Sequence, residues 1–468
     1  MNLINKFTSN IENIKEEDDE YEGEDENANI INTNSNKEFE KKDIFKSANT
    51  KLIKEEDVSP LLKFDLENDL NINSNTNGNS SRFTLFSSLK HKVKGKNKKM
   101  KVYQNAFLSN DYELKDQNVQ MDFKIQALRS VCSWSIGKTI TEHSILEAYY
   151  KLIDSSKHYI YIENQFFITK SYSEEERRNS GLNLNRLVQN EIGLHIRSRI
   201  ERAYDEGTNF KVFICIPLLP GFSGTPGESS TMNCILKHTY QTIARNNGMS
   251  LLEQLRKKMG DEVNKYIYFF SLRNHGTIKG IPVTELVYIH SKLMIVDDEK
   301  VLIGSANIND RSMAGSRDSE FAVIIEEDRN VQSIMDGKNF TAANYALTLR
   351  KHLMAEHLGL KHDNKMLDDP VNPNLWNEIR SRANVNAVIY RDIFDCFPDN
   401  KFNNFDKLRE RKKFNTKEEI EKLREEYKNK SFGIVGHIVE YPIEFLKDEE
   451  LDIDFFSKEN LVPERNFV

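Results

Sequence analysis

The sequence predicts an α/β domain with a largely covered β-sheet, preceded by a disordered N-terminal tail. Three observations lead to this fold class. From about residue 123 onward, short runs of β-branched and aromatic residues alternate with segments of helical periodicity. One run, KVFICIPLL at 211–219, is almost wholly apolar, as expected of a strand that is buried on both faces. The preceding residues show neither pattern and are rich in acidic residues, Asn and Lys.

The tail, residues 1–120, is expected to be disordered because it cannot bury enough apolar surface to offset the ordering of its backbone. Nine of the eleven residues at 16–26 are acidic, and NINSNTNGNSS at 71–81 is rich in Asn. Seven lysines lie within 90–101 (KHKVKGKNKKMK). This segment is either a solvated linker or localisation signal, or a patch for anionic lipid worth ~1 kcal/mol per lysine. The candidate membrane-binding residues are Lys92, Lys94, Lys96, Lys98 and Lys99.

The folded region, 121–468, begins with a helix at 144–153, whose apolar residues fall on one face. A strand at 158–168 follows, and then a long amphipathic helix at about 184–206 with Gly207 as its stop. Beyond residue 340 the pattern becomes helical and then irregular, with a late strand near 433–446. Further strands are expected at 211–219, 265–271, 284–289, 292–297, 301–303 and 321–325.

Composition excludes several classes of function. The net charge of −7 argues against a protein that binds nucleic acid through its overall charge. The four cysteines form no CxxC pair, so zinc and redox motifs are absent and a reducing compartment is expected. No apolar run reaches the ~18 residues of a membrane span, and the first residues lack a signal core. We therefore expect a cytoplasmic protein that contacts membranes peripherally. The cysteines are Cys132, Cys215, Cys234 and Cys396.

The residues that suggest chemistry lie within 288–320. His290 and Lys292 are two residues apart, so on a strand their side chains project from the same face and converge on one point. Asp297 ends this predicted strand, and a second short strand returns after the turn. Each of these residues, taken singly, has an ordinary structural explanation. Their combination brings an imidazole and a fixed positive charge to one end of a sheet.

Neutral donors follow directly after the returning strand. Gly304 and Ser305 predict a tight turn at which the backbone can approach a ligand, and Asn307 adds a side-chain amide. An imidazole, an ammonium and several neutral donors suit a phosphodiester, whose equatorial oxygens gain charge as phosphorus becomes pentacovalent.

The string His290-x-Lys292-x4-Asp297-x6-Gly304-Ser305-x-Asn307, at 290–307, resembles the HKD motif of the phospholipase D superfamily. The resemblance covers about 340 residues from 123 towards the C-terminus, with 340–468 as a helical and strand extension. It implies the second half of that fold, a mixed β-sheet flanked by helices on both faces. Strings similar to signatures of the eukaryotic branch are LRSVCSWS at 128–135, IYIENQFFI at 160–168, IPLLPGF at 216–222, VTELVYIHSKL at 283–293 and IGSANINDRS at 303–312.

The resemblance implies hydrolysis of phosphatidylcholine to phosphatidate and choline through a phosphohistidine intermediate, with no metal and no other cofactor. His290 is then the acid/base partner of a nucleophilic histidine from another HKD motif. The other implied catalytic residues are Lys292 and Asn307, which bind phosphoryl oxygens, and Glu320, which holds the remote ring nitrogen of His290. Supporting residues are Asp297, Gly304 and Ser305, and candidate substrate-binding residues are Asn164 and Gln165.

The sequence contains one HKD motif only. None of its other ten histidines has Lys two residues later and Asp five residues beyond. Three explanations are open: the chain is part of a longer or split enzyme, it pairs two copies of itself, or it has lost activity. We favour the first, because the matching strings are those of a second half. The partner is then a first HKD half, in cis, in trans or through homodimerisation.

Two rival functions remain at this point. The chain is either a catalytically inactive half with an interaction or regulatory role, or a single-motif nuclease, which the net charge and the IYIENQFFI string disfavour. The other expected partner is a phospholipid membrane, and nucleic acid is not expected. Phosphoinositides and small GTPases stay open as activators.

Overall fold

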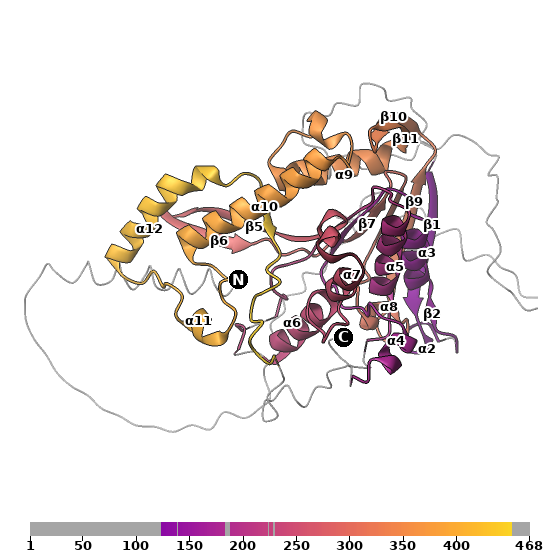
Figure 1. Ribbon diagram of the computed structural model, residues 1–468, viewed down its shortest axis with the longest axis horizontal. Coiled ribbons are helices and arrows are strands. Elements are labelled where there is room, and N and C mark those ends of the chain that lie inside the picture. The colour runs from indigo at the N-terminus through magenta and orange to yellow at the C-terminus, as the bar shows by residue number, and fades with distance from the viewer. Residues whose placement is uncertain (1–122, 138, 183–187, 223, 228–229, 452–468) are drawn as a thin grey trace, which may run out of the picture. The chain divides into compact units, whose positions relative to one another are not determined.

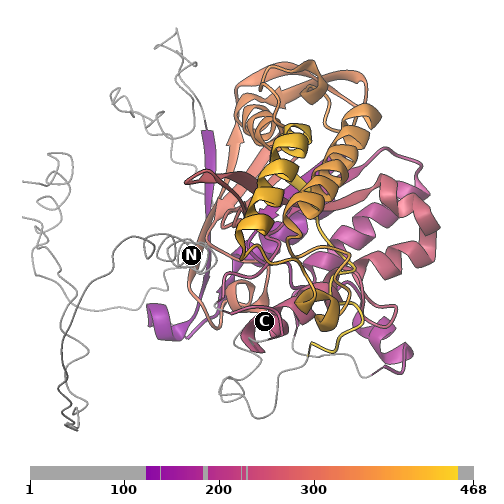
Figure 2. The same ribbon diagram turned by 90° about the vertical axis from the view of Figure 1, so that its left-hand side faces the viewer.

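The structure is a computed structural model that describes residues 123–137, 139–182, 188–222, 224–227 and 230–451 (Figures 1 and 2). The lysine-rich segment at 90–101 and the expected tail at 1–120 lie outside the described residues. None of the helices in the described ranges is long and apolar enough to cross a membrane.

A mixed sheet of ten strands forms the centre of the described region. Its order is β12-β5-β4-β3-β7-β8-β9-β1-β2, with β6 paired to β5. The pairs β3–β4 and β4–β5 are parallel, and the remaining pairs are antiparallel. The strands are β1 Phe123–Val131, β2 Glu142–His143, β3 Tyr159–Asn164, β4 Lys211–Cys215, β5 Ile267–Ile278, β6 Ile281–Leu286, β7 Lys292–Val296, β8 Lys300–Gly304, β9 Glu320–Glu327 and β12 Ile438–Glu440, and a separate hairpin is made by β10 Asn330–Met335 and β11 Lys338–Ala343.

Helices cover both faces of this sheet, as the sequence predicts. One apolar core joins the sheet to α3 Ser144–Ser155, α5 Ile192–Asp205, α6 Ser230–Ile243 and α7 Leu251–Met259. The other joins it to α9 Asn344–Leu358 and α10 Pro373–Phe394, with α12 Lys417–Lys430 beyond (Figure 1). Short helices are α2 Ser133–Ile136, α4 Glu174–Asn179, α8 Asp310–Met313 and α11 Phe405–Arg409.

Helix α3 follows the predicted periodicity closely. The five apolar residues that the sequence places on one face are all buried against the sheet, and Ser156 ends the helix in an extended conformation. Burying such a stripe is the main source of stability for a helix of this length. These residues are Ile145, Ala148, Tyr149, Leu152 and Ile153.

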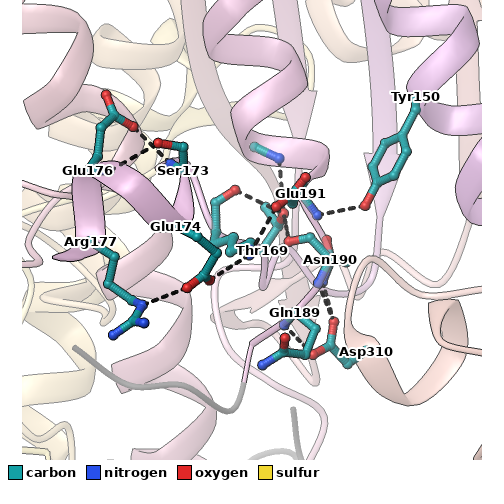
Figure 3. Close-up of polar contacts among 12 residues, drawn as sticks. Tyr150, Thr169, Ser173, Glu174, Glu176, Arg177, Gln189, Asn190, Glu191 and Asp310 are labelled. Carbon is teal, nitrogen blue, oxygen red and sulfur yellow. Dashed lines mark hydrogen bonds and ion pairs between the residues drawn. The ribbon is translucent and has the colours of Figure 1, made fainter.

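Helix α5 begins later than the sequence predicts. The pattern suggests a start near 184, but residues 188–191 are not helical and α5 starts at Ile192. Asp310 explains the difference, because its carboxylate accepts the backbone amides of Gln189 at 2.5 Å and Asn190 at 2.8 Å (Figure 3). Amides bound by a distant carboxylate are not available for helical hydrogen bonds, so tertiary contacts override the local periodicity.

Several predicted strands differ in their bounds. Strand β6 has the expected length but lies three residues earlier, at Ile281–Leu286, and residues 287–291 connect it to β7 without belonging to either strand. The strands predicted at 158–168 and 211–219 end early, at Asn164 and Cys215. The late strand near 433–446 is reduced to the three residues of β12, followed by Tyr441 and Pro442. Proline lacks the amide proton that a strand needs, which accounts for the early end.

One part of the sheet is left uncovered by the helices of the described ranges. On the face covered elsewhere by α9 and α10, Ile125 of β1 is 58% exposed and Phe321 of β9 is 59% exposed. The register places Ile125 opposite Ile325 and Ala127 opposite Val323, so these apolar residues form one continuous surface. We call it the open face, defined by Ile125, Ala127, Phe321 and Val323. Strand β1 lies at the side of the ribbon away from α12 in Figure 1.

Candidate active site

Two loops at one end of the sheet run side by side. The chain after β3 and the chain after β8 form a parallel bridge between Phe167 and Ile308, and the Ile168 amide donates to the Ile308 carbonyl at 2.9 Å. The Asn164 side chain fixes this arrangement, because its Oδ1 accepts from the amides of Phe166 and Ile308, both at 3.1 Å. Asn164 is fully buried. Its amide therefore shapes the site from behind, and its predicted contact with a substrate stays a prediction.

Lys292 carries the positive charge of the site. Its ammonium donates to Gln165 Oε1 at 2.8 Å and to the His290 carbonyl at 2.6 Å. An ammonium has three donors, so one is left for a ligand oxygen. The Lys292 residue is 6% exposed, and burial lowers its pKa to about 8, although nearby Glu320 acts to raise it. Gln165, the other predicted substrate-binding residue, also donates to Tyr288 Oη at 2.6 Å.

His290 lies just outside the strand on which the sequence places it, because β7 begins at Lys292. The residue is exposed, and its ring centroid lies 6.2 Å from that of Tyr288. Within the described ranges its imidazole makes no hydrogen bond. Its carbonyl, in contrast, is held by Lys292, so the backbone is fixed while the ring faces outward.

Glu320 opens β9 and lies beside the turn after β8. Its carboxylate accepts a short hydrogen bond from Ser305 Oγ and another from Ser312 Oγ at 2.6 Å. The predicted bond to His290 is absent from the described contacts, and two hydroxyls occupy the carboxylate instead. The turn after β8 approaches β9 closely at Gly304. Only glycine fits there, because a Cβ would lie 2.4 Å from the Phe321 carbonyl oxygen.

Asn307 carries an unpaired polar atom at the site. Its Oδ1 is buried and has no hydrogen-bond partner among the described residues. A buried polar group left without a partner costs about 1–3 kcal/mol, so such groups are often found where a ligand or water completes the bonding. An amide oxygen can only accept, so Oδ1 suits a donor such as water, and a bond to a phosphoryl oxygen would have to come from Nδ2. The predicted role of Asn307 in binding a phosphoryl group stays a prediction.

Asp297 holds the backbone at the start of β3 in place. Its carboxylate accepts three backbone amides at the start of β3, from Lys157 at 2.7 Å and from His158 and Tyr159 at 2.8 Å. Burial raises its pKa, and these three bonds act in the opposite direction. The next residue, Asp298, is fully buried in an ion pair with Arg350 of α9 at 2.7 Å. The turn after β7 thus joins two strands and a helix.

Replacing Asp297 with alanine is expected to lower the free energy of unfolding by about 3 kcal/mol, because three amides lose their acceptor. Thermal unfolding followed by circular dichroism measures the change. Asp318→Ala is the matched control, since Asp318 makes an exposed ion pair with Arg311 and should change stability little. Equal melting curves for the two variants would contradict this role for Asp297.

Asp310 supports the loop after β8 from the other side. Besides the amides of Gln189 and Asn190, it accepts from Asn190 Nδ2 at 2.8 Å (Figure 3). The same group of contacts includes Glu191, whose amide donates to Tyr150 Oη at 2.8 Å. Sequence reasoning did not single out Asp310, although it lies within the IGSANINDRS string.

The described residues contain no group of three or more His, Cys, Asp or Glu side chains that could hold a metal ion. The lysines predicted to bind membrane lie outside those residues. Sequence reasoning also missed Tyr288 and Ser312, which contact Gln165 and Glu320 respectively. Tyr288 lies within the string VTELVYIHSKL and Ser312 within IGSANINDRS, and this position in a family-like string is the feature of the sequence that could have identified them.

Comparison of the chain with known proteins identifies its family. Residues 82–401 match the family model described as Phospholipase D. The chain belongs to the phospholipase D family. It is 42% identical to Phospholipase D1 of Mus musculus over 346 residues, which cover 73% of this chain and 31% of that protein. It is 41% identical to Phospholipase D2 of Bos taurus over 343 residues, covering 72% and 35%. Phospholipase D zeta 1 of Arabidopsis thaliana is 39% identical over 355 residues, covering 70% and 31%.

The chain thus spans about a third of the length of these phospholipase D relatives. The family match begins at residue 82, before the first residue that the structure describes. The recognition of the HKD family from sequence is confirmed.

Proposed function

We propose that this chain supplies one half of a phospholipase D active site that hydrolyses phosphatidylcholine to phosphatidate and choline. One observation carries the proposal: the buried ammonium of Lys292 bonds the backbone carbonyl of His290, whose side chain is exposed, and keeps one donor unused among the described contacts. We assign proton transfer to a phosphodiester held by Lys292 to His290, whose backbone Lys292 bonds directly. The names of the phospholipase D relatives support the choice of a phospholipid over other phosphodiesters.

The proposed reaction needs a second histidine, which we assign to the other HKD half. That histidine attacks phosphorus, a nitrogen–phosphorus bond forms, and the bond from phosphorus to the choline oxygen breaks. His290 donates its proton to the departing choline oxygen. It then takes a proton from water, whose oxygen attacks phosphorus and releases the histidine together with phosphatidate. Lys292 and Asn307 hold the phosphoryl oxygens throughout.

We propose that the second histidine comes from a first half that docks on the open face. Two apolar residues exposed by more than half, Ile125 and Phe321, suggest a surface that is covered in the active assembly. Phe321 follows Glu320 on β9, so its side chain leaves the opposite face of the sheet at the strand end that carries the candidate site. Such an assembly would act at a membrane surface, where its substrate is found.

The test measures choline and phosphatidate released from phosphatidylcholine vesicles by the chain assembled with a first HKD half. Equal amounts of the two products are expected. With a soluble short-chain lipid, excess chelator should leave the rate unchanged, because the proposal assigns the phosphoryl charge to Lys292 and Asn307 and not to a metal ion. Cleavage of a nucleic acid without any release of choline would instead favour the nuclease.

The rate is expected to fall as pH rises through about 8, because Lys292 then loses the proton that gives it its charge. His290 must also be protonated to act as an acid, so Lys292→Arg separates the two causes. An arginine keeps its charge at this pH, and the fall near pH 8 should disappear from the profile of this variant. A fall that persists unchanged in Lys292→Arg would assign it to another group.

A further inference from the structure

A buried carboxylate lies behind the segment that carries His290. Glu163 sits on β3 in the middle of the sheet and is 6% exposed. Its Oε2 accepts from Ser291 Oγ at 2.6 Å, and its Oε1 accepts from Tyr161 Oη at 2.6 Å. His357 of α9 places its Nε2 3.3 Å from Glu163 and 2.8 Å from Tyr161 Oη. One strand, one helix and the residue after His290 therefore meet at a single carboxylate.

The bonds around Glu163 favour its charged form. Burial alone would raise the pKa of Glu163, but the bonds from His357, Ser291 and Tyr161 outweigh it and hold the pKa below its usual value. A buried charge is costly unless all its partners are present. Loss of the Ser291 hydroxyl would thus remove one of three bonds, and the rest of the network would keep Glu163 in place.

The segment that bears His290 depends on such side-chain bonds. Residues 287–291 lie outside the strands. Lys292 holds the His290 carbonyl at 2.6 Å, and Ser291 anchors the following residue to Glu163. Because successive side chains in extended backbone point to opposite faces, fixing Ser291 toward the core directs His290 toward the site. Ile289, on the same side as Ser291, is buried in the core that α9 covers.

We propose that Glu163, acting through the Ser291 hydroxyl, is a positioning residue for the His290 imidazole. The proposal rests on the proposed function, in which His290 transfers the proton to the leaving oxygen. Glu163 touches neither substrate nor His290, so it acts on the direction of the ring and not on the chemistry itself. A misplacement of about 1 Å at a reacting group can cost ~10²-fold in rate.

Kinetics of the assembled enzyme give the first test. Ser291→Ala should lower kcat at least tenfold and leave KM within about twofold, because substrate binding depends on Lys292 and Asn307. Ser291→Thr keeps the hydroxyl and should restore kcat to near the original value. The matched control is Ser156→Ala, which removes a buried hydroxyl with an equal 2.6 Å bond at the other end of β3. Its kcat should be unchanged.

A spectroscopic test on the full chain alone does not depend on turnover. The ¹⁵N resonances of the His290 ring, assigned by their loss in His290→Asn, should shift in Ser291→Ala and in Glu163→Gln. They should keep their positions in Ser156→Ala. This comparison also applies if the assembled Ser291→Ala enzyme proves unstable.

Two results would overturn the proposal: kcat and His290 resonances that are the same in Ser291→Ala as in Ser156→Ala, or a threonine variant as impaired as the alanine variant. The proposed function fails in a different way, namely through full activity of His290→Asn. An inactive His290→Asn enzyme alongside a fully active Ser291→Ala enzyme would refute only the positioning role.

Discussion

Replacing His290 with asparagine is expected to lower choline release by the assembled enzyme by ~10²–10⁴-fold, the usual contribution of one proton-transfer group. Asparagine has a similar shape at Cγ but cannot give or take a proton. The residue is exposed, and its imidazole makes no hydrogen bond in the described region, so the fold should tolerate the change. The loss should therefore appear in turnover and not in the melting temperature.

The matched control is His275→Asn. His275 is half-buried on β5 and bonds Tyr427 Oη at 3.0 Å, and it has no contact with the candidate site. This variant should keep its turnover even if its stability falls slightly. Near-original turnover by His290→Asn, measured at saturating phosphatidylcholine, would rule out a proton-transfer role for His290.

Local pattern was enough to predict the elements whose contacts are simple. The apolar stripe of α3 packs on the sheet as its spacing requires, and the spacing of Lys292 and Asp297 predicts the strand and the turn of β7. Asp297 adopts a φ of 55°, and so does Asp298, as expected of a tight turn between two antiparallel strands. These features follow from residues close together in the sequence.

The differences arise where distant residues compete for backbone groups. Asp310 lies 120 residues from Asn190 and takes its amide, so no local pattern could place the start of α5. Glu320 is a second example. The family resemblance predicts a hydrogen bond from its carboxylate to His290, whereas in the structure the carboxylate accepts from Ser305 and Ser312. Glu163 stands in a largely apolar strand, and its bond to Ser291 spans 128 residues, a distance over which no local pattern could pair them.

The chain kept monomeric is expected to release no choline, and a first HKD half should restore release. One histidine must be neutral to attack phosphorus while another is protonated to donate, and the single HKD motif of this sequence supplies only His290. None of the described helices covers the open face, and Ile125 and Phe321 are exposed there, so the isolated chain should aggregate more readily than the assembly. Light scattering must accompany every activity measurement to establish the mass of the active species.

Substitutions on the open face test where the first half docks. Ile125→Asp places a charge where an apolar contact is expected, and because Ile125 is 58% exposed the chain itself should still fold. Restoration of choline release should then fall at least tenfold. Phe432→Asp is the matched control, because Phe432 is 82% exposed in the short helix at Ser431–Gly433, which follows α12. That variant should be restored as fully as the original chain.

Each outcome of this experiment decides between the explanations for the single motif. Turnover by a confirmed monomer would refute the requirement for two histidines. Turnover by a dimer of this chain alone would favour two copies of His290 facing each other, and Ile125→Asp should then abolish both dimer and activity. If only the first half restores turnover, the surface of this chain is complementary to the first half and not to a second copy of itself. If the first half restores Ile125→Asp as fully as Phe432→Asp, the contact lies elsewhere than on the open face.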